Sequence, residues 1–561
     1  MNKIWLKSYQ PGIPEEIDLS AYASLVEMFE RSVTRFGERV AYINMGARLT
    51  YAALDAASRQ FAAYLQSVLR LPRGARVAIM LPNLLQYPVC MLGTLRAGGV
   101  VVNCNPMYTA RELHHQLADS GAETIVILEN FAFTLEEALP GTAVKHVVMA
   151  RLGDMLGFPK GKVVNFVVKH LLHKVPPWHL EEYTDFRDCL AAGARYVFDP
   201  VRVTQDDLAF LQYTGGTTGV CKGAMLTHRN MLANLLQAHA WVKSVVTENG
   251  ELIVTALPLY HIFAMTANCF LMLRVGATNL LITNPRDIPA FVAELKRHPF
   301  TILTGVNTLF NALLDNEAFR RLDFSRMKVS LGGGTAVQKS VAERWKKLTG
   351  RALIEAYGLT ETSPAVTVNP LDLPEYNGMI GLPLPSTEVA IRDDAGRDLP
   401  IGDVGELCVR GPQVMLGYYN QPEETAGVFM PDGFLRTGDL VVMEESGFMR
   451  LVDRKKDMIL VSGFNVYPNE VEEIVAMHPG VAEVAAIGVP DEKTGEAVKI
   501  FVVAREKSDT AGDTAATRDS IIALCRKHLT RYKVPSQIEF RQELPKTNVG
   551  KILRRALRER L

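Results

Sequence analysis

The chain has 561 residues, 48% of them apolar, which is enough material for more than one buried core. Basic residues and acidic residues number 61 each, so no global field favours a nucleic-acid partner. The seven cysteines are scattered, which argues against a disulfide framework or a thiolate metal site and indicates a reducing compartment. Without a secretory leader or an apolar run of membrane-spanning length, the sequence predicts a cytoplasmic protein.

Apolar runs alternate with segments of helical spacing over the first part of the chain. Arg76–Asn83 is predicted to be a buried strand, and the segment after it has helical spacing until Gly98 and Gly99 stop it. Comparable runs, each predicted to be a strand, are Glu123–Leu128, Glu251–Pro258 and Thr278–Thr283. This alternation predicts an α/β fold with mostly parallel sheets.

The segment Pro159–Pro177 is predicted to form a basic amphipathic helix. The apolar residues that share one helical face are Val164, Val167, Val168, Leu171 and Val175. The polar residues on the opposite face are Lys162, Asn165, Lys169 and His173. Two interpretations stay open: the helix lies on an anionic membrane surface, or it packs on its own domain.

The stretch Tyr213–Gly223, YTGGTTGVCKG, has the composition of a phosphate-binding loop. Its glycines let the backbone turn closely around an anion, its threonines supply hydroxyl donors, and Lys222 adds a positive charge. It departs from the common nucleotide loop because Cys221, not glycine, precedes Lys222. The predicted clamp consists of Tyr213, Thr214, Gly215, Gly216, Thr217, Thr218, Gly219 and Lys222. A simple glycine-rich turn is the alternative.

Beyond about residue 376 the pattern changes to short alternating strands with Gly-Pro and Asp-Gly turns, which predicts a β-rich subdomain over about 376–452. The charged stretch Asp453–Asp457 then precedes a last block of about a hundred residues. Within that block the pattern predicts a helix, a strand and a further helix, as in a small separate domain.

Five further motifs follow the loop in order: LPLYHIFA (257–264), SLGGGTA (330–336), EAYGLTETSP (355–364), FLRTGDL (434–440) and LPKTNVGKILRR (544–555). Together they resemble the adenylate-forming superfamily, which contains acyl-CoA synthetases, luciferases and peptide-synthetase adenylation domains. The resemblance spans nearly the whole chain, and the run 432–472 is similar to the signature segment of fatty acyl-CoA synthetases.

The resemblance implies an N-terminal AMP-binding domain (1–452) of α/β sheets plus the β-rich subdomain, a hinge (453–457) and a small mobile α+β C-terminal domain (458–561). It also implies that ATP activates a long-chain fatty acid to acyl-AMP, that coenzyme A takes the acyl group, that Mg²⁺ assists, and that the product feeds β-oxidation. Peripheral contact with the inner membrane and a homodimer are expectations of the same kind.

Other activities stay open on the sequence. They are a medium-chain or aryl-CoA ligase, a fatty acyl-AMP ligase that loads a carrier protein, and a membrane-surface protein that binds acyl chains or nucleotide without turnover. The length of an acyl tunnel depends on side chains that the linear sequence does not arrange in space.

Site residues follow from the resemblance by position. Lys551 corresponds to the lysine that bridges the carboxylate and the α-phosphate, and His261 to a histidine near the acyl entrance. Glu361, with Thr217, corresponds to the magnesium site. The residues matched to the adenosine and α-phosphate contacts are Gly332, Gly333, Gly334, Tyr357, Gly358, Thr360, Asp439 and Arg454. Lys456 is expected to be the pivot of the hinge, and Gly463 to lie beside the pantetheine arm of coenzyme A.

Overall fold

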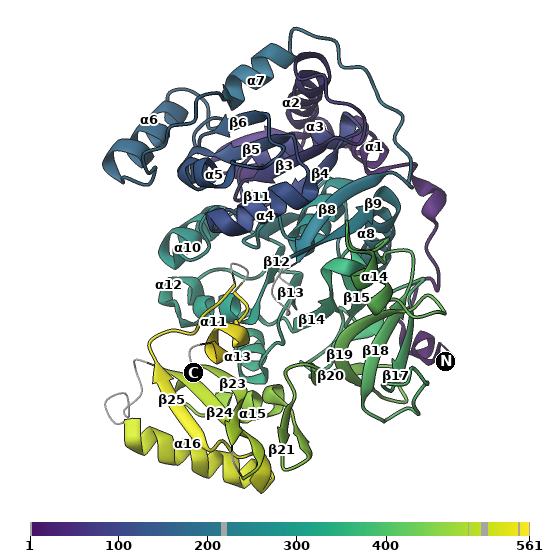
Figure 1. Ribbon diagram of the computed structural model, residues 1–561, viewed down its shortest axis with the longest axis vertical. Coiled ribbons are helices and arrows are strands. Elements are labelled where there is room, and N and C mark those ends of the chain that lie inside the picture. The colour runs from purple at the N-terminus through teal and green to yellow at the C-terminus, as the bar shows by residue number, and fades with distance from the viewer. Residues whose placement is uncertain are drawn as a thin grey trace.

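The computed structural model describes residues 3–214, 221–248, 250–491, 493–505, 514–547 and 550–559. Within these ranges the strands form four sheets, which we name I to IV (Figure 1). Sheets I and II carry the helices of the N-terminal part, sheet III is antiparallel, and sheet IV belongs to the last block of the chain. This arrangement is the α/β fold that the sequence predicts.

Sheet I contains the strand predicted at 76–83, which the structure forms as β3. Every pair of neighbouring strands in this sheet is parallel, except that β9 runs antiparallel to β8. In spatial order they are β7 (Thr184–Asp185), β6 (His146–Ala150), β5 (Thr124–Leu128), β3 (Arg76–Met80), β4 (Val100–Asn103), β8 (Leu208–Thr214) and β9 (Lys222–Thr227).

Sheet II contains the strands predicted at 251–258 and 278–283. It is parallel from β1 to β14 and antiparallel at both margins. In spatial order its strands are β16 (Leu382–Pro383), β15 (Ala365–Val368), β14 (Leu353–Gly358), β13 (Val329–Gly333), β12 (Ile302–Gly305), β10 (Leu252–Thr255), β11 (Thr278–Leu281), β1 (Val40–Asn44) and β2 (Ala47–Thr50).

Helices cover sheets I and II, and side-chain caps mark where several of them begin. Thr109 and Thr227 start α4 and α8 with capping boxes, which satisfy first-turn amide groups. The helices of this part are α1 (Leu25–Phe36), α2 (Tyr51–Ala63), α3 (Gln86–Arg96), α4 (Ala110–Ser120), α5 (Ala132–Ala138), α6 (Lys160–Phe166), α7 (Phe186–Gly193), α8 (His228–Val242), α9 (Leu271–Arg274), α10 (Ile288–Arg297), α11 (Asn307–Asp315), α12 (Glu317–Arg320) and α13 (Lys339–Thr349).

A large apolar core joins the two sheets. Phe210 of β8 packs against Phe270 with ring centroids 6.1 Å apart, and both belong to a cluster that also contains buried residues of α1, α2, α3 and α8. Burial of large aromatic rings contributes strongly to stability. The sheets are therefore fixed relative to each other, and so are the loops at their edges.

Sheet III follows the change of pattern near residue 376. Its antiparallel strands are β17 (Glu388–Arg392), β18 (Gly405–Arg410), β19 (Leu435–Met443) and β20 (Met449–Arg454). Helix α14 (Pro422–Val428) interrupts the chain between β18 and β19. Only the part 405–410 of the predicted run VGELCVRGPQVMLGYY forms a strand of this sheet.

The last block of the chain lies beside α11, because Arg505 forms an ion pair with Asp315 of that helix (Figure 1). Its strands are β21 (Ile459–Val461), β22 (Phe464–Val466), β23 (Val481–Asp491), β24 (Gly495–Ala504) and β25 (Gln537–Arg541). Its helices are α15 (Pro468–Ala476), α16 (Thr514–His528) and α17 (Arg554–Arg558). These strands and helices make the small α+β block that the resemblance implies.

The predicted amphipathic helix is shorter than the segment that suggested it. Helix α6 continues as a π-helix over Val167–Leu171, and the chain then turns at His173, whose φ is +49°. Val175 therefore lies beyond the helix. Asn165 and Lys169 contact Gly153 and Glu129 of the same chain, so part of the predicted polar face points toward the protein.

Candidate active site

The predicted nucleotide residues of sheet II meet at the carboxyl ends of two adjacent parallel strands. β13 ends at Gly333, β14 ends at Gly358, and the register pairs Gly333 with Ala356. The edge where parallel strands present their carboxyl ends is the usual ligand-binding edge of an open α/β sheet. The fold therefore brings Gly332–Gly334, Tyr357 and Gly358 to one edge.

Close packing accounts for three of these glycines. A Cβ added to Gly332 would lie 2.7 Å from Val337 Cγ2, and one added to Gly358 would lie 2.0 Å from the carbonyl oxygen of Pro364. An added Cβ on Gly333 would lie 3.0 Å from the ring of Phe263. The resemblance implies a ligand against Gly332 and Gly333, and in the structure neighbouring side chains also crowd the space that a Cβ would take there.

Gly334 differs because its φ of +76° disfavours any other residue. A Cβ placed there would lie 3.4 Å from Cε of Lys551. The backbone turn after β13 is therefore the surface on which the Lys551 side chain rests.

Asp439 is held from two sides. The phenol of Tyr357 donates a hydrogen bond of 2.6 Å to its Oδ2, and Nε of Arg454 lies 3.4 Å from its Oδ1. Asp439 and Arg454 are register partners on β19 and β20. Burial raises the pKa of Asp439, while Arg454 and the Tyr357 hydrogen bond act in the opposite direction. A carboxylate held in this way can accept hydrogen bonds from a diol.

Lys551 reaches this cluster from the last block of the chain. The hydroxyl of Thr308 on α11 donates to the carbonyl of Gly550 at 3.4 Å, and the amide of Lys551 donates to Thr547 Oγ1 at 3.1 Å. Burial lowers the pKa of Lys551 to about 8, with repulsion from Arg454 as the next cause. The carboxylates of Asp439 and Glu361 oppose that shift, so they lie near enough to interact with the ammonium group.

The two ends of the predicted phosphate clamp that the structure describes lie on neighbouring strands, β8 and β9. Thr214 ends β8, Lys222 begins β9, and the two residues are register partners. The ammonium of Lys222 pairs with Glu424 of α14. The phenol of Tyr213 donates to Asp119 Oδ2 at 2.5 Å, so its side chain is fixed against α4. Gly215, Gly216, Thr217, Thr218 and Gly219 lie outside the described residues.

Glu361 lies in the short 3₁₀ helix η7 (Thr360–Thr362), which also holds Thr360. Its Oε1 accepts a hydrogen bond of 2.8 Å from the phenol of Tyr418. Among the residues that the structure describes, no group of three His, Cys, Asp or Glu side chains could hold a metal by itself. A single carboxylate suits Mg²⁺ that keeps several waters and binds through substrate phosphates, so the donor set fits a metal that arrives with a nucleotide.

His261 precedes a π-helix (Ala264–Phe270) near the ends of sheet II. Its Nδ1 accepts a long hydrogen bond of 3.4 Å from the amide of Phe263. Burial lowers its pKa to about 3, and repulsion from Lys551 adds to that effect. The imidazole is therefore neutral near pH 7, with its proton on Nε2.

The predicted hinge begins where β20 ends. Asp453 Oδ2 accepts a 2.8 Å hydrogen bond from the amide of Asn469 on α15, and the amide of Lys455 donates to the carbonyl of Gly438 at 3.0 Å. Burial lowers the pKa of Lys456 to about 8, with Arg454 as the next cause. Gly463 lies at the β21–β22 turn with φ +82°, and no described atom lies within 4 Å of a Cβ added there.

Sequence reasoning misses Tyr418 and Glu424, which contact two of the predicted residues. Tyr418 is 57 residues from Glu361 along the chain, and Glu424 is 202 residues from Lys222. The stretch LGYYNQPEET follows β18 and has no periodicity or motif that would single out either side chain. Only the folded arrangement of sheets I and III brings them to the site.

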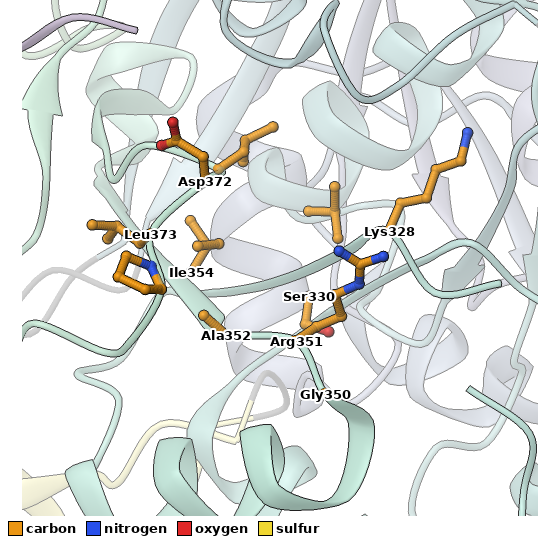
Figure 2. A pocket seen from close by; sticks show the side chains of 11 residues that line it. Lys328, Ser330, Gly350, Arg351, Ala352, Ile354, Asp372 and Leu373 are labelled. Carbon is orange, nitrogen blue, oxygen red and sulfur yellow. The ribbon is translucent and has the colours of Figure 1, made fainter. Parts of the chain in front are cut away.

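A separate cavity of about 180 Å³ lies at the opposite edge of sheet II (Figure 2). Figure 2 shows Lys328, Ser330, Arg351 and Asp372 around it, close to the residues where β13 and β14 begin. Because the predicted nucleotide residues stand where these strands end, this cavity is distinct from the candidate site.

Two family models match the chain. Residues 29–419 match the AMP-binding enzyme model, and residues 470–551 match the AMP-binding enzyme C-terminal domain. A curated protein of Salmonella typhimurium, named long-chain-fatty-acid–CoA ligase, is 58% identical over 100% of this chain and 98% of its own length. A Bacillus subtilis protein of the same name is 37% identical over 99% of this chain and 98% of its own length.

Solved structures agree with this match. The anthranilate CoA ligase AuaEII, in complex with anthranoyl-AMP, superposes with a TM-score of 0.84 at 24% identity, over 97% of this chain and 99% of that one, which shows the fold. ATP-bound MatB from Rhodopseudomonas palustris gives a TM-score of 0.79 at 28% identity, over 95% of this chain and 98% of that one. From its strands, its motifs and these full-length matches, the chain belongs to the AMP-binding enzyme family.

Proposed function

We propose that this protein is an ATP-dependent long-chain fatty acid–CoA ligase. It joins the fatty acid carboxylate to the α-phosphate of ATP, releases pyrophosphate, and passes the acyl group of the adenylate to the thiol of coenzyme A with release of AMP. The high identity to curated ligases of that name supports the substrate class. The observation that carries the mechanism is the position of Lys551 beside Gly334, within the influence of Asp439 and Glu361.

The first half-reaction brings two anions together, so its transition state gains from fixed positive charge. In this proposal Lys551 would approach both the attacking carboxylate and the α-phosphate, and Lys222 would approach the departing pyrophosphate. Asp439, fixed by Tyr357 and Arg454, would accept hydrogen bonds from the ribose hydroxyls. These groups are held before substrate arrives, so little reorganisation is needed.

Mg²⁺, when bound with the nucleotide, would neutralise charge on the phosphates. Glu361 would hold it, together with the predicted Thr217. The neutral imidazole of His261 can donate from Nε2 toward the bound carboxylate. Because this imidazole is neutral, it does not repel the ammonium group of Lys551.

The second half-reaction requires Lys551 to leave, because the thiol must approach the adenylate. We assign the N-terminal domain to 1–452, the hinge to 453–457 and the mobile domain to 458–561, with the pivot at Lys456. The hydrogen bond between Asp453 and the Asn469 amide crosses that boundary, so rotation would break it. Gly463 would then come to lie beside the pantetheine arm.

Product analysis tests the proposal. The protein is incubated with ATP, Mg²⁺, coenzyme A and carboxylic acids from medium to long chain and aryl, and AMP, ADP and acyl thioesters are quantified. AMP, pyrophosphate and a long-chain acyl-CoA support it, and Lys551→Ala should abolish adenylate formation. Preference for a medium-chain or aryl acid, or acyl-AMP that never reaches coenzyme A, would instead establish one of the alternative activities.

We also propose peripheral contact with an anionic membrane through the α6 surface, defined as residues 158–174. Phe158 is 84% exposed, Phe166 58% and Leu171 63%. No acidic residue occurs between Asp154 and Glu181, whereas the same stretch contains several lysines. Exposed apolar side chains with basic neighbours are typical of interfacial helices, and a substrate that partitions into lipid would be collected there. In the described residues no helix is long and apolar enough to cross a membrane.

Vesicle flotation tests this contact. Wild type and the double variant Phe158→Ser/Phe166→Ser are compared on phosphatidylglycerol-rich and phosphatidylcholine vesicles, with Met477→Ser, an exposed apolar residue elsewhere, as the control. We expect the wild type and the control to float with anionic vesicles only, and the double variant to remain at the bottom. Equal flotation of all three proteins would contradict the assignment to α6. A homodimer stays a family-level prediction that light scattering would test.

A further inference from the structure

Tyr418 is the point where two charged residues of the phosphate site meet. Its phenol donates a 2.8 Å hydrogen bond to Oε1 of Glu361, and the ammonium of Lys222 lies 5.3 Å from the centroid of its ring. Glu361 belongs to η7, whereas Lys222 begins β9. A single side chain therefore contacts both the cation assigned to pyrophosphate and the carboxylate assigned to the metal.

The backbone around Tyr418 is firmly held. Its amide donates to Thr425 Oγ1 at 2.9 Å, and an antiparallel bridge joins it to Ala224 of β9. On either side, the Met225 amide donates to Gly417 and the Tyr419 amide to Gly223. The backbone of Tyr418 thus lies along β9 as an added strand residue would, which sets where its side chain starts.

The phenol of Tyr418 donates to one of the two carboxylate oxygens of Glu361. Because the hydrogen bond engages Oε1, it restricts rotation of the Glu361 carboxylate and leaves Oε2 for another partner.

Lys222 has an exchangeable partner in this arrangement. Its ammonium pairs with Glu424, half-exposed at the start of α14, and also lies over the Tyr418 ring. A phosphate oxygen can replace the Glu424 carboxylate without moving Lys222 away from the ring. The aromatic contact would persist while the ionic partner changes.

We propose that Tyr418 is a positioning residue for the magnesium–nucleotide complex: its hydroxyl orients Glu361 and its ring positions Lys222. The inference rests on the proposed function for the roles of Glu361 and Lys222. It predicts that the two contributions separate, because the hydroxyl acts through Glu361 only when the metal is present, whereas the ring acts on the phosphates through Lys222 with or without the metal.

Calorimetric titration with α,β-methylene-ATP, which cannot form an adenylate, tests this separation without turnover. Tyr418→Phe keeps the ring and removes the hydroxyl, Tyr418→Leu removes both, and Tyr419→Phe is the matched control on the adjacent residue. Hydrogen-bonded partners of metal-binding carboxylates typically matter by about ten- to a hundredfold. We expect Tyr418→Phe to bind about tenfold more weakly with Mg²⁺ and normally in EDTA, and Tyr418→Leu to bind more weakly in both.

Two results would overturn the proposal. One is wild-type affinity of Tyr418→Phe in Mg²⁺, equal to that of Tyr419→Phe. The other is an equal loss in Mg²⁺ and in EDTA, which would mean that the hydroxyl acts on the fold. Should Tyr418→Leu fail to fold, Tyr418→Phe alone decides. Failure of the wild type to make acyl-CoA would refute the proposed activity and leave these binding results standing.

Discussion

The phenol of Tyr357 and the carboxylate of Asp439 form a 2.6 Å hydrogen bond that joins the end of β14 to β19 of sheet III. Removing the hydroxyl keeps the contact between that carboxylate and Arg454. We expect Tyr357→Phe to raise the KM for ATP about tenfold, with a smaller change in kcat, because Asp439 loses its fixed orientation. Steady-state kinetics with saturating fatty acid and coenzyme A measure it.

The control for that variant is Tyr9→Phe, which removes a hydroxyl bonded to the carbonyl of Pro383. It should leave the KM for ATP unchanged. Asp439→Ala should raise that KM more than Tyr357→Phe does. An unchanged KM in Tyr357→Phe would mean that Arg454 alone is sufficient to orient Asp439.

We expect Lys551 to give the first half-reaction a pH dependence. Burial places its pKa at about 8, so the ammonium form predominates below that pH and is lost above it. We expect kcat/KM for ATP in adenylate formation to fall above pH 8, approaching tenfold per pH unit, since this ratio reports the free enzyme. Pyrophosphate release measures it.

Lys456 has a similar pKa of about 8, so Lys456→Gln serves as the control. That variant should keep the alkaline decline in adenylate formation. A rate that stays level to pH 9.5 in the wild type would argue against a charged Lys551 in this step.

Gly463→Leu should separate the two half-reactions. The β21–β22 turn leaves room for a side chain in this conformation, so adenylate formation should change little. The leucine would obstruct the pantetheine arm, and acyl-AMP should accumulate while thioester formation falls by about tenfold or more. Quenched-flow measurement of both products checks this.

Backbone strain is controlled with Gly495→Leu, because Gly495 has a nearly equal φ of +78° in the same sheet. If both leucine variants slow thioester formation equally, the effect comes from the fold. If Gly463→Leu forms thioester at the normal rate, the pantetheine assignment is wrong.

Glu355, fully buried on β14, makes stability depend on pH. Burial raises its pKa to about 8, while the Val337 amide and the Tyr376 phenol donate to it. In the unfolded chain this carboxyl ionises near pH 4.5, so its stabilising contribution is complete below that pH. The contribution is lost at up to about 1.4 kcal/mol per pH unit as pH rises toward 8.

Glu355→Gln cannot ionise, so this loss is absent from the variant. Relative to wild type, its free energy of unfolding should rise between pH 5 and pH 8, as measured by urea denaturation. Glu317→Gln, an exposed change of the same kind on α12, should show no such trend. Parallel curves for wild type and Glu355→Gln would contradict the raised pKa.

Strands and the order of motifs were predictable from the sequence because both are local. The run 124–128 is buried at every position and forms β5, and apolar residues are sufficient to specify such a strand. Likewise, the YGLTE and TGD motifs locate Tyr357 and Asp439 along the chain. Their hydrogen bond, by contrast, joins residues 82 positions apart and depends on how sheet III packs on sheet II.

Contacts between residues far apart in the sequence also explain which residues the sequence does not predict correctly. Tyr418 becomes important through contacts with β9 and η7, and its own neighbours in the sequence do not reveal it. The helical period predicts Val175 on the apolar face, whereas the chain adopts a positive φ at His173 and leaves the helix before that residue. A glycine triplet cannot show from sequence whether a ligand or its own neighbours exclude the side chain.

The pairing of Asp439 with Arg454 on neighbouring strands places the predicted nucleotide contact inside the predicted hinge 453–457, two residues before Lys456. A rotation about Lys456 would therefore have its axis close to the bound adenylate. Asp439 and Arg454, which lie near such an axis, would move little while the last domain carries Lys551 away. The acyl-AMP, a reactive mixed anhydride, would then stay in place, shielded from hydrolysis. Around it, the rotating domain would replace Lys551, used in the first half-reaction, with Gly463, used in the second.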